Sequence, residues 1–287
     1  MTSRTAPGLG IPGWLLWTAD QLRADPLMRY LLVATCLIGV AGCMPLNPRA
    51  AAPAMPEAQS SITREQAAAE LVTARALIVT YDYAKARGHV TPVIADAERW
   101  GWLDVESDAH FLLGELFDRE RKSREAADAY ARAYDASRRL NDRVRGLRTL
   151  NALTNALLDR GALDKARETA AEAYRLALRD NDVAAQATAQ NNLAEADRLA
   201  GRLAAAREGY ERALSLARQT DSRAAVASIL LNLGVTERRA GRLAKARARF
   251  AEARELARGL DDARGGAYAE WNLEQIDAEI QKQGGTR

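Results

Sequence analysis

The stretch LAGRLAAAREGYERAL, residues 199–214, decides the fold because related segments stand 40 residues before it and 40 residues after it. The earlier segment is DRGALDKARETAAEAY at residues 159–174, and the later one is RAGRLAKARARFAEAR at residues 239–254. All three carry a glycine at the same point: Gly161, Gly201 and Gly241. Because glycine tolerates the backbone angles of a tight turn, this spacing predicts a repeated unit of 40 residues with a turn at each glycine.

A fourth unit precedes these three, in DRERKSREAADAYARAY at residues 118–134, where Arg121 replaces the glycine. In each unit a leucine stands eight residues before the junction: Leu113, Leu153, Leu193 and Leu233. Two alanines follow five and twelve residues after it: Ala126 and Ala133, Ala166 and Ala173, Ala206 and Ala213, Ala246 and Ala253. Nine residues after the junction stand Tyr130, Ala170, Tyr210 and Phe250. Small residues such as alanine at fixed places allow helix axes to approach each other closely.

This arrangement resembles the tetratricopeptide repeat, in which two antiparallel helices meet at a turn. The usual unit has about 34 residues, and the longer unit is similar to the repeats of kinesin light chains and related adaptors. The resemblance covers roughly residues 104–282 and implies an all-α fold, a right-handed α-solenoid of helix hairpins with a capping helix or helices at each end. We expect four units at residues 104–260, off-register N-terminal capping helices at residues 61–103, and a C-terminal capping helix and tail at residues 261–287.

Local signals predict where helices begin. Asp or Ser in the loops between units can cap the following helix, and TREQ at residues 63–66 makes a capping box. Pro92 is expected to open another helix of the N-terminal cap. Trp100 and Trp102 are expected to pack against the first unit.

The apolar stretch MRYLLVATCLIGVAGC, residues 28–43, is too short for a membrane span of about 20 residues. Arg29 precedes the apolar run, and the last four residues resemble the lipobox of bacterial lipoproteins. That resemblance implies a signal peptide at residues 28–42 and lipid on Cys43, with a Pro- and Ala-rich tether at residues 43–60. An uncleaved anchor and a buried helix are the alternatives.

Residues 1–27 precede this signal, and we expect them to be untranslated or part of the leader, with translation starting at Met28. Met44, rather than Asp, follows the cysteine. In enterobacteria-like envelopes this resemblance implies a lipid-anchored protein of the outer membrane that faces the periplasm.

Charge and composition argue against several functions. The 41 Lys and Arg against 38 Asp and Glu are interspersed rather than gathered in basic blocks, so we expect no nucleic-acid partner. The chain has two histidines and shows no phosphate-binding loop, Cys/His cluster or catalytic triad, so we expect no enzyme, no cofactor and no metal. The enzyme alternative would need a site around His89, His110, Glu115 and Asp118.

Asparagines directly precede the leucine of the seam at Asn192, Asn232 and Asn272, and Asn191 stands next to Asn192. In the second unit Asn151 is displaced by one position and Asn155 follows one turn later. In the long-repeat adaptors that this chain resembles, such residues form a ladder that hydrogen-bonds the backbone of an extended peptide. A carboxamide suits this task because it both donates and accepts. The alternative is that these residues bond to neighbouring backbone or to each other.

Four nearby charged residues, Glu195, Arg198, Arg238 and Arg239, would favour mixed or partly acidic segments. The sequence therefore predicts a membrane-anchored adaptor or scaffold in the cell envelope, whose groove binds an extended segment of an envelope protein. A self-associating oligomeric spacer is the structural alternative.

Overall fold

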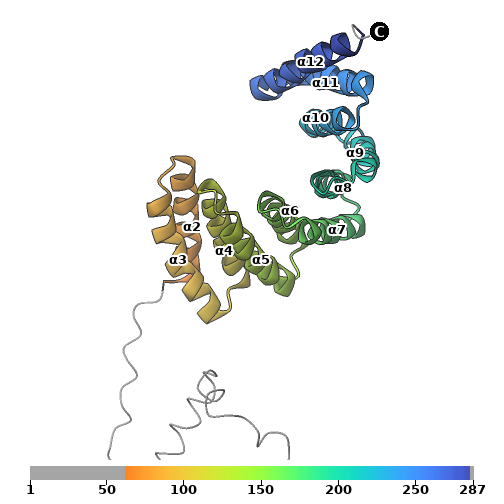
Figure 1. Cartoon of the computed structure of the whole chain (residues 1–287). Helices are drawn as coiled ribbons and strands as arrows, with labels where there is room; N and C mark the ends of the chain where they lie inside the picture. The colour runs from red at the N-terminus through yellow and green to blue at the C-terminus, as the bar shows by residue number, and fades with distance from the viewer. Residues whose placement is uncertain (1–61, 285–287) are drawn as a thin grey trace, which may run out of the picture. The chain divides into compact units, whose positions relative to one another are not determined.

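The computed structural model describes residues 62–284, and this part of the chain contains eleven consecutive α-helices and no strand (Figure 1). The helices are α2 (Arg64–Val79), α3 (Tyr83–Trp100), α4 (Leu103–Arg119), α5 (Ser123–Leu140), α6 (Arg143–Asp159), α7 (Leu163–Arg179), α8 (Val183–Leu199), α9 (Leu203–Ala217), α10 (Arg223–Arg239), α11 (Leu243–Arg258) and α12 (Ala263–Gly284). The predicted all-α fold of packed helix pairs is confirmed. The predicted signal peptide, Cys43 and the tether lie outside the described residues.

The helices form a solenoid because each one packs against the next along the chain. The even-numbered helices also contact one another in succession, α2 with α4 and onward to α12. Among the described helices, no odd-numbered helix contacts another odd-numbered one. The even-numbered helices therefore form one continuous surface, which we call the inner face, and the odd-numbered helices lie behind it.

Left-handed backbone angles mark the turns at intervals of 40 residues. Within the pairs they occur at Tyr81, Arg121, Gly161, Gly201 and Gly241, with φ between 61° and 77°. Between pairs they occur at Gly101, Asn141, Asn181 and Asp261. The prediction that residues 62–100 are off-register is therefore wrong, because α2 and α3 turn at Tyr81 as the later pairs do. Tyr81 replaces the glycine there, which hid the repeat in the sequence.

Pro92 lies inside α3 and does not begin a helix, so that prediction is also wrong. Proline removes one backbone donor and clashes with the preceding turn. Burial of Val90 and Val93 on either side of it holds the helix against the core, and the Thr91 hydroxyl donates to the carbonyl of Arg87 at 3.0 Å.

The predicted helix caps are confirmed. The Thr63 hydroxyl accepts from the Gln66 amide at 3.2 Å, and the Gln66 side chain accepts from the Thr63 amide at 2.7 Å. Asp or Ser side chains accept from backbone amides at the starts of five further helices: Asp82, Asp142, Asp182, Ser222 and Asp262. These bonds satisfy helix amides that have no partner within the helix.

The seam inside each pair follows a rule of complementary size. All eight predicted alanines are buried, as are Tyr130, Ala170, Tyr210 and Phe250. Opposite the ring of Phe250 stands Gly234, and opposite Tyr130 stands Gly114. In the second unit the buried residue Thr154 takes the place of the glycine, and Ala170 takes the place of the aromatic residue. The absence of an aromatic in this unit is thus compensated by a larger residue across the seam.

The last helix, α12, closes the solenoid with a polar outer side. Leu273 and Ile276 pack toward α11 and α10, whereas Glu270 and Glu274 are exposed at positions that Leu230 and Gly234 occupy, buried, in the preceding pair. A polar outer face is what the open end of a solenoid needs in water. The predicted capping helix is therefore present at this end.

The two tryptophans near α3 differ from each other. Trp102 packs against the first core cluster, as expected. Trp100 is half exposed, and the guanidinium of Arg99 lies 5.0 Å from its ring centroid, so the expected packing of Trp100 does not occur.

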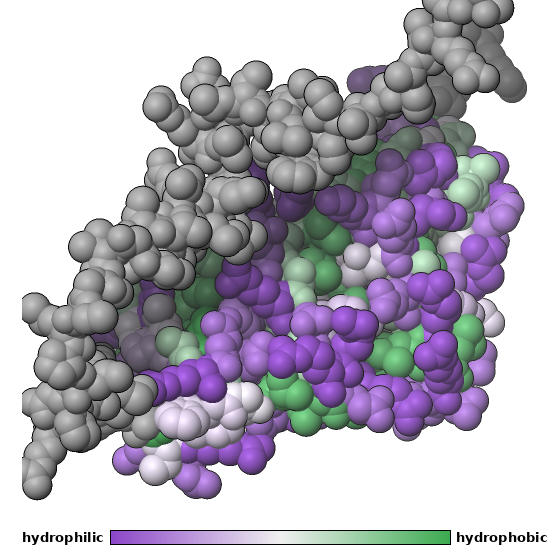
Figure 2. Space-filling view, turned by 90° about the horizontal axis from the view of Figure 1, so that it is seen from below, coloured by the Kyte–Doolittle hydropathy of each residue, from purple (hydrophilic) through white to green (hydrophobic). Residues whose placement is uncertain are grey.

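The surface of the described residues is largely hydrophilic on the side seen in Figure 2, with hydrophobic residues in separate patches. Within residues 62–284, no helix is both long enough and apolar enough to span a bilayer.

Candidate functional site

The structure brings four of the six predicted asparagines together on the inner face. Asn151 lies on α6, Asn191 and Asn192 on α8, and Asn232 on α10. The side-chain amide of Asn232 donates to Asn191 at 3.2 Å, and that of Asn192 donates to Asn151 at 3.5 Å. Asn191 also donates to Asn192 at 3.4 Å. We call this connected set the asparagine chain.

The asparagine chain leaves hydrogen-bonding capacity unused. A carboxamide offers two N–H donors and an oxygen with two lone pairs. Two of the three bonds, at 3.4 and 3.5 Å, are beyond the usual range of 2.7–3.2 Å and are therefore weak. Asn151, Asn191 and Asn232 are each partly exposed, so their free groups can reach a molecule on the inner face.

The other two predicted asparagines lie outside this chain. Asn155 is exposed, and no hydrogen bond joins it to another described residue. Asn272 is buried on α12, where its amide donates to the carbonyl of Tyr268 at 2.9 Å and its oxygen accepts from Arg238 at 3.4 Å. Asn272 thus holds its own helix and α10 in place.

Glu195 and Arg198 form a partly buried ion pair beside the asparagine chain. Arg198 donates to Glu195 through Nε at 2.8 Å, and the Tyr210 hydroxyl donates to the same carboxylate. Burial raises the pKa of Glu195, but the bonds from Arg198 and Tyr210 outweigh it and hold that pKa below its usual range. Burial, together with the charge of Glu195, raises the pKa of Tyr210. The Tyr210 bond also links α9 to α8, so this ion pair contributes to the packing of the two helices.

The two arginines at the end of α10 have different surroundings. Arg238 donates to Glu279 of α12 through Nε at 3.0 Å. Arg239 is exposed, and no hydrogen bond or ion pair joins it to another described residue. Of the four predicted charged residues, Arg239 alone forms no hydrogen bond or ion pair with a described residue, although its charge contributes to the low pKa of Glu195.

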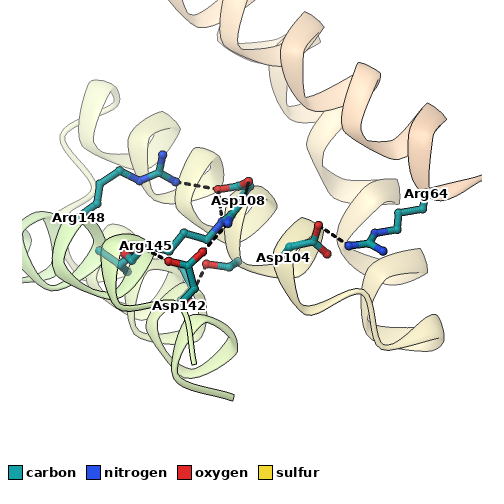
Figure 3. A network of polar contacts seen from close by, with 9 residues as sticks. Arg64, Asp104, Asp108, Asp142, Arg145 and Arg148 are labelled. Atoms are coloured by element: carbon teal, nitrogen blue, oxygen red, sulfur yellow. Dashed lines mark hydrogen bonds and ion pairs between the residues drawn. The ribbon is translucent and has the colours of Figure 1, made fainter. Parts of the chain in front are cut away.

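Ion pairs connect successive even-numbered helices at the α2 end of the solenoid (Figure 3). The sequence analysis did not identify this network. Asp108 on α4 accepts from Arg145 at 3.0 Å and from Arg148 at 2.8 Å, both on α6. Arg64 on α2 donates to Asp104 on α4 at 2.6 Å. Opposite charges exactly one repeat apart, as in the pairs 64 and 104 or 108 and 148, were the available signal.

Arg148 makes a second contact besides its bond to Asp108. Its guanidinium lies 4.0 Å from the ring centroid of Phe111, a cation–π contact. The hydrogen bonds that Arg145 donates to Asp108 raise the pKa of Arg145, so this guanidinium stays charged.

The residues of the enzyme alternative do not converge. His89 bonds to Glu70, and His110 is buried and lies 3.2 Å from Glu98. Glu115 and Asp118 of α4 line a separate pocket together with residues of α3 and α5, where the Tyr130 hydroxyl donates to Asp118 at 2.7 Å. No hydrogen bond or ion pair links either histidine to these two acids in residues 62–284.

Burial shifts the pKa values of three residues named for the enzyme alternative. It lowers the pKa of His110 and raises the pKa values of Glu115 and Asp118. Within the described part of the chain, no group of three His, Cys, Asp or Glu residues could hold a metal ion.

The comparisons agree with this architecture. Residues 185–259 match the family model of the tetratricopeptide repeat. No curated protein matches the sequence. The apo form of RapI has a TM-score of 0.65 at 12% identity, over 76% of this chain and 84% of RapI.

Two further solved structures share the fold. PilF of Pseudomonas aeruginosa has a TM-score of 0.52 at 17% identity, over 76% of this chain and 98% of PilF. The Rap conjugation gene regulator of plasmid pLS20, solved in complex with the Phr* peptide, has a TM-score of 0.56 at 15% identity, over 82% of this chain and 70% of the regulator. Residues 185–259 are therefore tetratricopeptide repeats, and the helix pairs from Arg64 to Arg258 form an α-solenoid of that type.

Proposed function

We propose that the chain is a lipid-anchored adaptor of the cell envelope, outer-membrane attached and facing the periplasm, whose inner face binds an extended segment of another envelope protein. Tetratricopeptide solenoids serve in protein–protein interaction, and a curved surface lined by one helix of each pair is where such repeats bind partners. Peptide binding by the fold has a solved example in the pLS20 regulator with its Phr* peptide.

The observation that carries the binding half of the proposal is the asparagine chain. An extended segment presents an N–H and a C=O at every residue and needs partners that both donate and accept. Asn151, Asn191 and Asn232 supply such groups in successive even-numbered helices. The two bonds of the chain that involve Asn192 are long, and bonds to a peptide could replace them at little cost. Binding through backbone groups would place few demands on the side chains of the partner.

The anchoring half rests on the residues before the solenoid. The apolar run that ends at Cys43 has the layout of a lipoprotein signal. One acyl chain binds a membrane marginally, whereas the two or three chains of a lipoprotein bind it stably. An adaptor gains from such an anchor because it stays where its partner is.

Site-specific photocrosslinking in cells tests the binding proposal. A photoreactive residue at Asn191 on the inner face should crosslink to one segment of an envelope protein, which mass spectrometry would identify. The matched control is the same residue at Arg212, which is exposed on α9 behind the inner face. Equal crosslinking from both positions would contradict the proposal, and crosslinks from Asn191 to a second copy of this chain would favour the self-associating spacer.

A further inference from the structure

A pocket at the α12 end of the inner face joins predicted site residues to apolar residues that the sequence prediction did not single out. Tyr268 and Trp271 of α12 and Val235 of α10 line it, together with Arg238 and Arg239, and its volume is about 380 Å³. That volume lies within the range of small ligand sites. The two aromatic side chains are 46% and 53% exposed, so half of their surface faces water.

The aromatic residues are exposed on the inner face and not on the outer end of the solenoid. The side of α12 that a further helix would cover carries Glu270 and Glu274, both exposed, and Glu270 pairs with Arg254 at 2.8 Å. A solenoid end built for stacking a second copy would carry apolar residues there instead. The exposed Trp271 is therefore part of the inner face and not of an end-to-end interface.

The pocket continues the asparagine chain. Trp271 stands one repeat after Leu231 and two repeats after Asn191, in the same register column. Asn272, directly beside it, is one repeat after Asn232, which begins the asparagine chain. A segment that runs along the asparagines toward α12 would thus reach the pocket next.

The charges of the pocket select its occupant. Arg238 is neutralised by Glu279, whereas Arg239 forms no ion pair with any residue in the range 62–284. Two aromatic rings and a valine offer apolar contact to a side chain, and a free guanidinium offers a bidentate partner to a carboxylate.

We infer that this pocket accepts a large apolar side chain of the bound segment, with a neighbouring Asp or Glu of that segment on Arg239. This inference rests on the proposed function, because it assumes that an extended segment lies on the inner face. It adds side-chain specificity to a groove whose asparagines read only the backbone.

Selection from a displayed library of random linear peptides tests the inference on the full chain. The wild type should enrich peptides that carry a large apolar residue beside an acidic one. Trp271→Ala should bind those peptides about ten- to a hundredfold more weakly, since it removes the contact surface of one large apolar side chain. Arg239→Gln should lose the preference for the acid and keep that for the apolar residue. Trp100→Ala, a half-exposed tryptophan on α3, is the matched control and should bind as the wild type does.

The failures of the two proposals are distinguishable. If the peptides that the wild type selects carry no large apolar residue, the pocket inference is wrong and binding to the inner face stands. The same conclusion follows if Trp271→Ala binds the selected peptides as tightly as the wild type does. If no peptide is enriched by the wild type, both proposals are wrong. Light scattering measures the oligomeric state of both proteins. If the wild type is a dimer and Trp271→Ala is a monomer, the pocket binds a second copy of the chain and the inference is overturned.

Discussion

Gly114 of α4 and Tyr130 of α5 fit together so closely that a β-carbon on Gly114 would lie 2.5 Å from Cε1 of the tyrosine ring. Tyr130 is buried and its hydroxyl is held by Asp118, so the ring has little room to move. We predict that Gly114→Ala lowers the free energy of unfolding by about 1–2 kcal/mol through overpacking, despite the better helix propensity of alanine. Chemical denaturation measures it.

Gly88 supplies the control for that prediction. It lies inside α3, and a β-carbon built on it would meet nothing within 4 Å. Gly88→Ala should therefore raise the free energy of unfolding by up to about 1 kcal/mol. If both glycine variants change stability in the same direction, the close fit of α4 and α5 is not what limits residue 114.

The turns at Arg121 and Gly201 form a second matched pair. Both have left-handed angles, φ 61° and φ 77°, but only the glycine adopts them without steric cost. Arg121→Gly should stabilise the chain by about 1 kcal/mol, and Gly201→Ala should destabilise it by a similar amount. Thermal melting of the two variants beside the wild type measures both effects, and no change at either position would contradict the assigned turns.

Glu115 and Glu195 occupy the same register position but titrate in opposite directions. Burial raises the pKa of Glu115, so its charged form destabilises the fold as the pH rises above the ordinary glutamate pKa. Glu115→Gln should therefore stabilise the protein at pH 7, and the gain should vanish as the pH falls below that value. Denaturation midpoints across the acidic range measure this.

Glu195 should show the reverse. Its pKa is held low in the fold by Arg198 and Tyr210 against the effect of burial, so its charge adds stability above the ordinary glutamate pKa. Glu195→Gln should destabilise the protein at pH 7, with the loss fading as the pH falls through the lowered pKa. If the two variants change the free energy of unfolding in the same direction across this pH range, the environments assigned to Glu115 and Glu195 are wrong.

The anchor has a simple genetic test. Cys43→Ala should release the chain from the membrane fraction and abolish incorporation of labelled fatty acid, because no other residue of the lipobox can carry the lipid. Cys36→Ala is the control and should leave both unchanged. Persistent membrane attachment of the Cys43 variant would favour an uncleaved anchor instead.

The repeat could be predicted from sequence wherever glycine or alanine had to occupy a fixed place. Gly161, Gly201 and Gly241, with the buried alanines, defined the register of α6 to α11. The first pair was missed because Tyr81 stands at its turn and Val93 replaces the second seam alanine. A left-handed residue other than glycine costs only about 1–2 kcal/mol, so a solenoid can accept it and the sequence signal is then lost.

The site was predictable by residue type but not by contact. The asparagines were identified from their recurrence, whereas their bonds join residues 41 positions apart and so depend on how successive helices are offset. Asn272 was grouped with the others, yet its bonds are local to α12 and Arg238. The sequence does not single out Tyr268 and Trp271, because only the structure shows which side of α12 belongs to the inner face.

The most direct test of the central claim is the affinity of the crosslinked partner segment, made as a synthetic peptide, for the Asn191→Ala, Asn232→Ala double variant. Both residues are partly exposed and form one of the bonds of the asparagine chain, so circular dichroism and the melting temperature should stay near those of the wild type. We predict that binding weakens about 10- to 100-fold, as expected for two lost hydrogen bonds to the peptide backbone, while Arg212→Ala binds as the wild type does. An unchanged affinity in a folded double variant would contradict the claim that this face binds an extended segment.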